Sequence, residues 1–185
     1  MSIDTLTECA SCAHSRQVSK ISELLAESMG YAPDEIAVIQ QAALLHDIGK
    51  INISDKILNK PGILTPEEYE LVKTHTTSGY NEIIKVIDSL TLAAEVCRDH
   101  HERPDGSGYN GGVTGEHIHP YSSIVAAADV FDALYSERSY KEAWVIDKII
   151  KYFQENSGTQ FDAAIVERLL LNIENIQSLY NQGVE

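Results

Sequence analysis

Basic residues are few in this sequence. Lys and Arg number 14 against 28 Asp and Glu, which gives a formal net charge of −14. A surface with this charge repels polyanions at long range, so we expect no duplex nucleic acid partner. A small anionic substrate is compatible with the composition if local cations hold it, and bound divalent metal ions are the obvious source.

Long apolar runs are also missing. The longest, such as residues 124–128, are far too short to cross a bilayer. The N-terminus has neither the basic nor the apolar region of a signal peptide. We therefore expect no membrane partner and a cytoplasmic location. The length of 185 residues, with 43% hydrophobic residues, suits one globular domain spanning residues 1–185.

Cysteine is scarce, with Cys9, Cys12 and Cys97 as its three occurrences. An odd count argues against a disulfide framework. Cys9 and Cys12 form a C-x-x-C pair, the spacing seen in zinc and redox sites, but no second pair lies nearby. We interpret the pair as two small residues near the start of a helix.

Strand signals are nearly absent, because no run alternates cleanly between apolar and polar residues. Helical spacing is found almost throughout. The first helix carries His14 and stops before Gly30, and the second runs from Pro33 toward His46 and ends at Gly49. A capping box of Thr65 and Glu68 opens the next helix, which we expect to continue to His75. Further helices are expected at residues 91–101, 121–134, 142–155 and 162–181.

Residues 102–120 form the single long irregular stretch and contain five of the glycines. Long ordered loops in compact domains are usually functional. The sequence therefore predicts an all-α domain with one elaborate loop.

Histidine and aspartate recur where helices end or are buried. His46 and Asp47 close one helix, and Asp129 lies on the apolar helix expected at residues 121–134. Each residue alone has an ordinary structural interpretation. Together they suggest a transition-metal site, since these side chains are the usual ligands and a buried carboxylate needs a partner charge. The candidate ligands are His14, His46, Asp47, His75, His100, His101 and Asp129.

Two ions roughly 3.5–4 Å apart are a known device for hydrolysing phosphate esters. One ion activates a bridging water as hydroxide, and both neutralise charge developing on the phosphate. A histidine-rich, carboxylate-bridged cluster fits that task. His46 and Asp47 are adjacent and cannot share one helix face, but at a helix end both can turn toward one site, where Asp47 could bridge two metals.

The motifs resemble a known family. Residues 46–50, His-Asp-Ile-Gly-Lys, resemble the core of the HD phosphohydrolase superfamily, and residues 100–109 resemble the HHExxDGxGYP signature of its HD-GYP subfamily. Residues 60–62, 129–134 and 138–141 resemble further family segments in the same order. The similarity runs from about His14 to Asp162. It implies an HD-superfamily helical bundle with a long glycine-rich loop beside the metal site.

The resemblance also implies roles for single residues. One divalent metal, commonly iron or manganese, would take His14, His46, Asp47 and Asp129. A second would share Asp47 and take His75, His100 and His101. Asp47 and Lys50 are the implied catalytic residues, and the implied substrate contacts are Lys50, Tyr109, Arg138 and Lys141.

The implied reaction opens cyclic di-GMP to pGpG, continuing to GMP in some members, while related members act on cyclic GMP-AMP. The family also suggests a regulatory protein or domain docking at the GYP loop, and a homodimer. Few residues precede His14, so a regulatory domain lies on another chain or the sequence is an excised domain.

The sequence departs from the family pattern at four places. Asn110, Ser139 and Ser54 replace family prolines. Each lost proline frees a φ angle in the unfolded chain, which lowers stability by about 0.4–1 kcal/mol, and should make its loop less rigid. Ala10 stands where three-metal members carry a carboxylate, which favours two metals. His117 and His119 match no family ligand, and we interpret them as surface residues.

Two alternatives remain open. The chain could be an HD phosphohydrolase acting on another nucleotide, although His75, His100 and His101 as a second-metal set argue against this. It could also be a non-catalytic module that binds a cyclic dinucleotide or a protein. The complete ligand set disfavours that function, whereas the altered loops at Asn110 and Ser139 keep it open.

Overall fold

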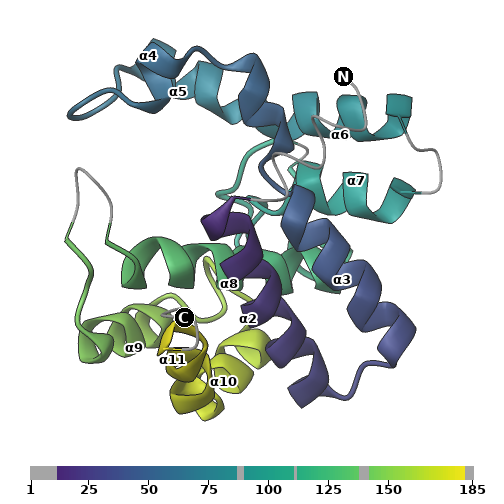
Figure 1. Ribbon diagram of the computed structural model, residues 1–185, viewed down its shortest axis with the longest axis vertical. Helices are drawn as coiled ribbons and strands as arrows, with labels where there is room; N and C mark the ends of the chain where they lie inside the picture. The colour runs from purple at the N-terminus through teal and green to yellow at the C-terminus, as the bar shows by residue number, and fades with distance from the viewer. Residues whose placement is uncertain (1–11, 87–89, 111, 138–141, 182–185) are drawn as a thin grey trace.

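The computed structural model describes residues 12–86, 90–110, 112–137 and 142–181. Within these ranges the chain is helical, and the sole β feature is an isolated bridge between Ser157 and Phe161 (Figure 1). The prediction of an all-α fold is confirmed. No described helix combines the length and the apolarity that crossing a membrane requires.

Helices α2 (Ala13–Met29) and α3 (Pro33–Leu45) pack side by side, and α8 (Pro120–Tyr135) lies against α2. Cys12 caps the start of α2, while Gly30 ends it in the left-handed conformation with φ 82°. Ile21, Ile124 and Phe131 are fully buried between these helices. Burying one such side chain contributes about 1.5–3 kcal/mol. The apolar helix expected at residues 121–134 is therefore a central element of the core.

A second layer consists of α6 (His75–Val86) and α7 (Thr91–Asp99), with α7 packed on α3. The predicted ends of two helices are wrong here. Helix α3 stops at Leu45, and Gly49 lies inside the short 3-10 helix η1 (Ile48–Asn52). The helix expected from Thr65 through His75 is interrupted at Thr74, which ends one helix, so that His75 opens the next.

Helices α4 (Asp55–Leu58) and α5 (Pro66–Lys73) extend from one side of the body (Figure 1). Thr65 and Glu68 form the predicted capping box at the start of α5. Since Thr74 ends α5 and α6 begins at once, this extension is joined directly to the helix that carries His75.

Three helices follow α8: α9 (Ile146–Glu155), α10 (Ala163–Leu171) and α11 (Ile173–Asn181). The helix expected from residue 142 therefore begins later, and the one expected at 162–181 is two helices. Asn172 caps α10 and separates the two. The break allows Leu169 and Ile176 to reach the same core, where both are fully buried.

The predicted irregular stretch contains one short 3-10 helix, η3 (Gly115–His117). Asn110 has φ 113°, a value that the ring of proline, fixed near −65°, cannot adopt. Its side chain donates a hydrogen bond to the carbonyl of Arg98 (2.9 Å). Asn110 thus has a backbone conformation and a hydrogen bond that proline cannot supply, while the effect of the lost proline on loop rigidity stays a prediction. Ser139 lies outside the described residues.

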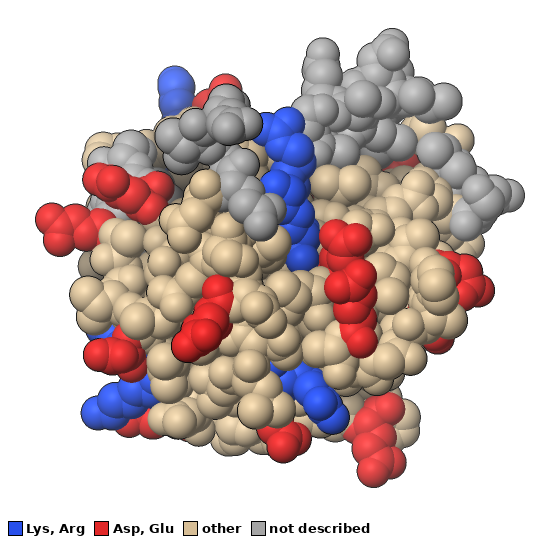
Figure 2. Space-filling model, turned by 60° about the horizontal axis from the view of Figure 1, so that its bottom comes forward, with Lys and Arg blue, Asp and Glu red and all other residues tan. Residues whose placement is uncertain are grey.

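Charged side chains are spread over the surface. On the face shown in Figure 2, acidic side chains lie separately among uncharged ones, and basic side chains form a short row near the middle. The charge of −14 is therefore not gathered in one acidic patch on that face.

Candidate metal centre

The structure brings all seven predicted ligand side chains into one cluster. They come from α2, the α3–η1 junction, the start of α6, the end of α7 and the middle of α8. Three groups have ligand atoms within 4.8 Å of one another: His14, His46 and Asp129; His46, Asp47 and His100; and His75, His100 and His101.

Asp47 lies between the outer two groups. Its Oδ2 is 3.3 Å from Nε2 of His46 and 3.8 Å from Nε2 of His14, while its Oδ1 is 3.4 Å from Nε2 of His75. Burial opposes its charged form, but His46 and Lys50 hold the pKa of its carboxyl well below its usual range. Asp47 is therefore placed with one oxygen facing each group, as the bridging hypothesis requires.

Asp129 completes the first group from α8. Its Oδ1 is 3.1 Å from Nε2 of His14 and 3.8 Å from Nε2 of His46. Its side chain keeps 16% of its surface exposed, so the expectation of a buried carboxylate is only partly right. Burial opposes protonation of His14, but hydrogen bonds to Asp129 and Asp132 raise its pKa to about 10. A metal bound at Nε2 of His14 would therefore replace a proton.

Three of the histidines are held in the same way. Each directs Nδ1 at the backbone carbonyl three residues earlier, and the pairs are His46 with Ala43 (2.7 Å), His75 with Val72 (2.7 Å) and His100 with Cys97 (2.8 Å). A carbonyl only accepts hydrogen bonds, so Nδ1 carries the hydrogen in each neutral ring and Nε2 keeps a lone pair. Burial keeps His75 and His100 neutral, so their lone pairs are available to a metal. Burial opposes protonation of His46 too, but neighbouring Asp47 raises its pKa, so a metal bound there would replace a proton.

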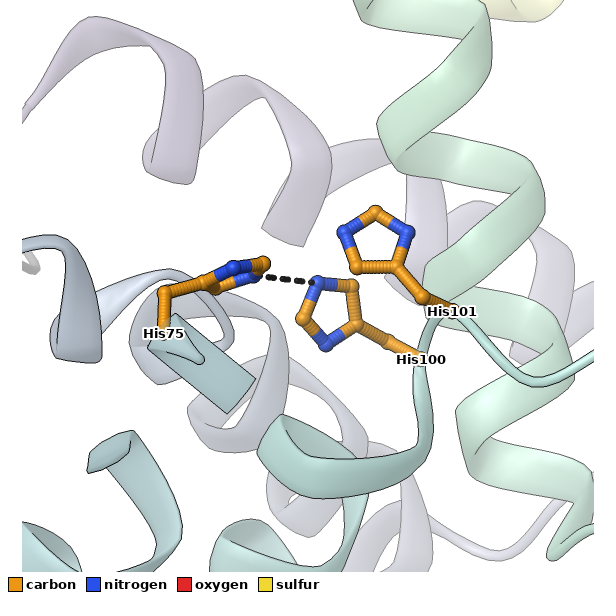
Figure 3. A group of neighbouring side chains, drawn as sticks. All are labelled: His75, His100 and His101. Atoms are coloured by element: carbon orange, nitrogen blue, oxygen red, sulfur yellow. Dashed lines mark hydrogen bonds between the residues drawn. The ribbon is translucent and has the colours of Figure 1, made fainter. Parts of the chain in front are cut away.

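The cluster also contains polar atoms that the protein leaves unsatisfied. Nε2 of His75 lies 3.5 Å from Nε2 of His100 (Figure 3), and this contact is a hydrogen bond only when one of the two rings carries its hydrogen on Nε2. Nε2 of His46 and Oδ1 of Asp47 are buried and have no hydrogen-bond partner in the described part of the chain. Unpaired buried polar atoms are costly, and a cation bound beside them would satisfy both.

The histidines of the third group, His75, His100 and His101, stay neutral. Burial lowers the pKa of His75 and His100, and it lowers the pKa of His101 to about 4. Neutral imidazole is the form that binds metal. The donor set of imidazole nitrogens and carboxylate oxygens therefore fits divalent transition metals.

Two predicted substrate residues border the cluster. Lys50 pairs with Asp47, and its side chain is 40% exposed. The ring of Tyr109 stacks on His101, with centroids 4.8 Å apart. Lys73, which the sequence did not single out, holds its ammonium 5.8 Å from the Tyr109 ring centroid. Arg138 and Lys141 lie outside the described residues, as do Cys9 and Ala10.

The two remaining histidines take no part in the cluster. Nδ1 of His119 accepts a hydrogen bond from the backbone of Tyr121 (3.2 Å) and so caps α8, while His117 is exposed on η3. Sequence reasoning gave no role to Asp132, whose Oδ2 is 2.6 Å from Nδ1 of His14. Its spacing of three from Asp129 was the available signal, because residues three apart share a helix face.

Comparison with known proteins gives consistent matches. The family model described as HD domain matches residues 5–165. The chain is 41% identical over 168 residues to the cyclic di-GMP phosphodiesterase response regulator RpfG of Xanthomonas campestris, covering 90% of this chain and 44% of that protein. It is 38% identical over 159 residues to 3'3'-cGAMP-specific phosphodiesterase 2 of Vibrio cholerae, covering 85% and 30%. The chain thus spans less than half the length of these relatives.

A solved structure supports the fold. An HDG"Y"P protein from Bdellovibrio bacteriovorus superposes with a TM-score of 0.69 at 22% identity, over 87% of this chain and 51% of that one. At this identity the likeness concerns the arrangement of the helices.

Proposed function

The chain belongs to the HD domain family, in its HD-GYP branch, and we propose that residues 1–185 form one catalytic domain that hydrolyses a cyclic dinucleotide, with cyclic di-GMP as the first candidate. The observation that carries the proposal is the convergence of seven histidine and aspartate side chains around Asp47. The names of the relatives supply the substrate class, and the cluster supplies a place for the chemistry.

We assign two divalent ions, iron or manganese, to the cluster. The first is held by His14, His46, Asp47 and Asp129, and the second by Asp47, His75, His100 and His101. The grouping of the ligand atoms supports this division, since the outer groups share no residue and Asp47 lies between them. Bound there, the ions would activate water for attack on phosphorus and offset the charge developing on the phosphate.

The chain's own residues prepare this reaction. Lys50 lies beside Asp47 and is partly exposed, so its ammonium can contact a phosphate oxygen without leaving the bridging carboxylate. The oxygen of water forms a bond to phosphorus, the bond from phosphorus to the 3'-oxygen breaks, and a proton passes to that oxygen. The product is linear pGpG, and a second hydrolysis would give GMP.

A protein nucleophile is not part of the proposal. Cys97 is buried with its thiol donating to the carbonyl of His46 (3.0 Å), and burial raises its pKa. The reactive thiolate is therefore suppressed. Hydrolysis in ¹⁸O-labelled water should place the label on the product phosphate, whereas a trapped phospho-enzyme would contradict this mechanism.

Tyr109 is proposed as a wall of the substrate site. Burial and the neighbouring Tyr69 raise its pKa, so the phenol stays neutral and can donate a hydrogen bond. Its stacking on His101 fixes the ring next to the group of His75, His100 and His101. A base or phosphate of the substrate bound over these histidines would contact Tyr109 at the edge of the site.

The proposed activity is tested by turnover. Purified protein loaded with Mn²⁺ or, without oxygen, with Fe²⁺ is incubated with cyclic di-GMP and separately with 3'3'-cGAMP, and the products are separated by chromatography. We expect pGpG or GMP from cyclic di-GMP and no product from the Asp47→Ala variant. Tight binding without product would instead support the non-catalytic module, and faster cleavage of 3'3'-cGAMP would move the assignment to that substrate.

A further inference from the structure

His14 is oriented differently from the other histidines of the cluster. His46, His75 and His100 each use a carbonyl three residues earlier in the chain. His14, the second residue of α2, is not held in this way. Its Nδ1 lies instead 2.6 Å from Oδ2 of Asp132, a residue of α8 that is 118 positions away.

Asp132 is itself held on its other oxygen. Its Oδ1 accepts hydrogen bonds from the hydroxyl of Tyr180 (2.8 Å) and from Oγ of Ser136 (3.0 Å). Asp132 is 3% exposed, and Tyr180 comes from α11. Burial and the Asp132 carboxylate raise the pKa of Tyr180, so its hydroxyl keeps the proton that it donates. One carboxylate thus links α11 and α8 to the ring of His14 on α2.

We propose that Asp132, fixed by Tyr180 and Ser136, is a positioning residue that orients His14 and directs its Nε2 at the first metal. The inference rests on the proposed metal centre. A carboxylate accepts the hydrogen of Nδ1, which leaves Nε2 as the ligand atom and makes it more basic than a carbonyl does. The first metal would then depend on a carboxylate-supported histidine, whereas His75 and His100 of the second set use backbone carbonyls.

The Asp132→Asn variant should disturb this arrangement selectively. Tyr180 and Ser136 donate to Oδ1, so the asparagine oxygen satisfies them and its amide NH₂ turns toward His14. The new amide group and the Nδ1 hydrogen of His14 are both donors, which favours the His14 tautomer that carries its hydrogen on Nε2. That hydrogen blocks the atom that would bind the metal. Loss of such supporting partners lowers metal affinity about 10–100-fold.

The experiment is a titration of metal-free protein with Mn²⁺, in which free Mn²⁺ is measured by electron paramagnetic resonance. We expect the unchanged chain to bind two equivalents of Mn²⁺. In Asp132→Asn, the affinity for one equivalent should fall about 10–100-fold while the affinity for the other is retained. Tyr180→Phe should weaken the same equivalent by less. Asp147→Asn and Tyr152→Phe are matched controls, because Asp147 is exposed on α9 and the Tyr152 hydroxyl donates to Gln160.

A second measurement separates positioning from general stability. In a His14→Ala background, Asp132→Asn should have no further effect on Mn²⁺ affinity, because Asp132 acts on the metal through the ring of His14, which this background lacks. In zinc-loaded protein, the His14 ring N–H bonded to a carboxylate should give a downfield proton signal that vanishes in Asp132→Asn.

The inference is overturned if both equivalents weaken alike, if Asp132→Asn binds as the unchanged chain does, or if its effect persists in His14→Ala. Failure of the unchanged chain to take up any metal would overturn the metal centre itself. The two failures are therefore distinguishable.

Discussion

At the scale of single residues, Asp47 has the largest expected effect, since its two oxygens face different ligand groups. We predict that Asp47→Ala loses both metals, whereas His101→Ala loses only the second. Elemental analysis of protein purified without chelator gives the metal content of each variant directly. Retention of two equivalents by Asp47→Ala would contradict the bridging assignment.

Arg138 and Lys141 carry a prediction that the described residues do not test. The metals can hold only the scissile phosphate of a cyclic dinucleotide, so cations must hold the other on a protein with net charge −14. We expect Arg138→Ala and Lys141→Ala to lower kcat/KM for cyclic di-GMP about 10–150-fold each, the range for a hydrogen bond to a charged group. Turnover of a small generic phosphodiester and metal content should stay nearly unchanged. Equal losses on both substrates would contradict the clamp.

At Asn110 we predict that proline, the residue of the family pattern, would destabilise this chain. Restoring proline by Asn110→Pro forces φ away from 113° and removes the bond to Arg98, so we expect a loss of about 1–2 kcal/mol in unfolding free energy. Asn110→Gly keeps the backbone conformation accessible and should cost less. Urea unfolding measures both. A stabilised Asn110→Pro variant would show that the loop can adopt the family conformation.

At the scale of elements, the contact between η1 and α6 sets the distance between Asp47 and His75. A Cβ atom on Gly49 would lie 1.8 Å from the carbonyl oxygen of His75 and 2.5 Å from the nitrogen of Gly79. Backbone atoms cannot rotate aside, so any side chain at Gly49 must push the two elements apart.

We therefore predict that Gly49→Ala costs about 1–3 kcal/mol in unfolding free energy and weakens metal binding as well. Gly112→Ala is the control, because its Cβ would meet no atom within 4 Å while its φ of 62° still penalises alanine. That variant should lose stability without losing metal affinity. Unaltered Mn²⁺ binding by Gly49→Ala would mean that the spacing of η1 and α6 does not govern the site.

The limits of prediction from sequence are also clearest for elements. The ligands in the motifs around His46 and His100 could be predicted from the sequence, because the spacing and the residue types of a motif are local features. The break at Thr74 and the one at Asn172 were missed, since helical spacing continues through both. Tyr180 was missed for a related reason: it meets Asp132 only through the packing of α11 against the body of the domain. Tertiary contacts of this kind leave no periodic signal.

At the scale of the whole molecule, the metals should contribute to stability. Ligands from five parts of the chain meet in the cluster, and metal binds them only when they are folded together. At free metal about 100-fold above Kd, the gain is about 2.7 kcal/mol. For a protein of this size, that corresponds to about 5–10 °C in Tm.

We thus expect chelation to lower Tm by about 5–10 °C and added Mn²⁺ to restore it, as followed by circular dichroism. The Asp47→Ala variant is the control, because chelation should leave its Tm unchanged. An unchanged Tm in the unaltered chain would argue that the cluster is fully stable without cations.

The link from His14 through Asp132 to Tyr180 has a consequence for how the protein is made. A ribosome adds about 5–20 residues per second, so the 118 positions between His14 and Asp132 take about 6–24 s to synthesise, and Tyr180 follows 48 positions later. His75, His100 and His101, with Asp47, emerge well before that. The growing chain therefore releases every ligand proposed for the second metal before Asp129, and the support of His14 by Asp132 and Tyr180 can form only when α11 has left the ribosome.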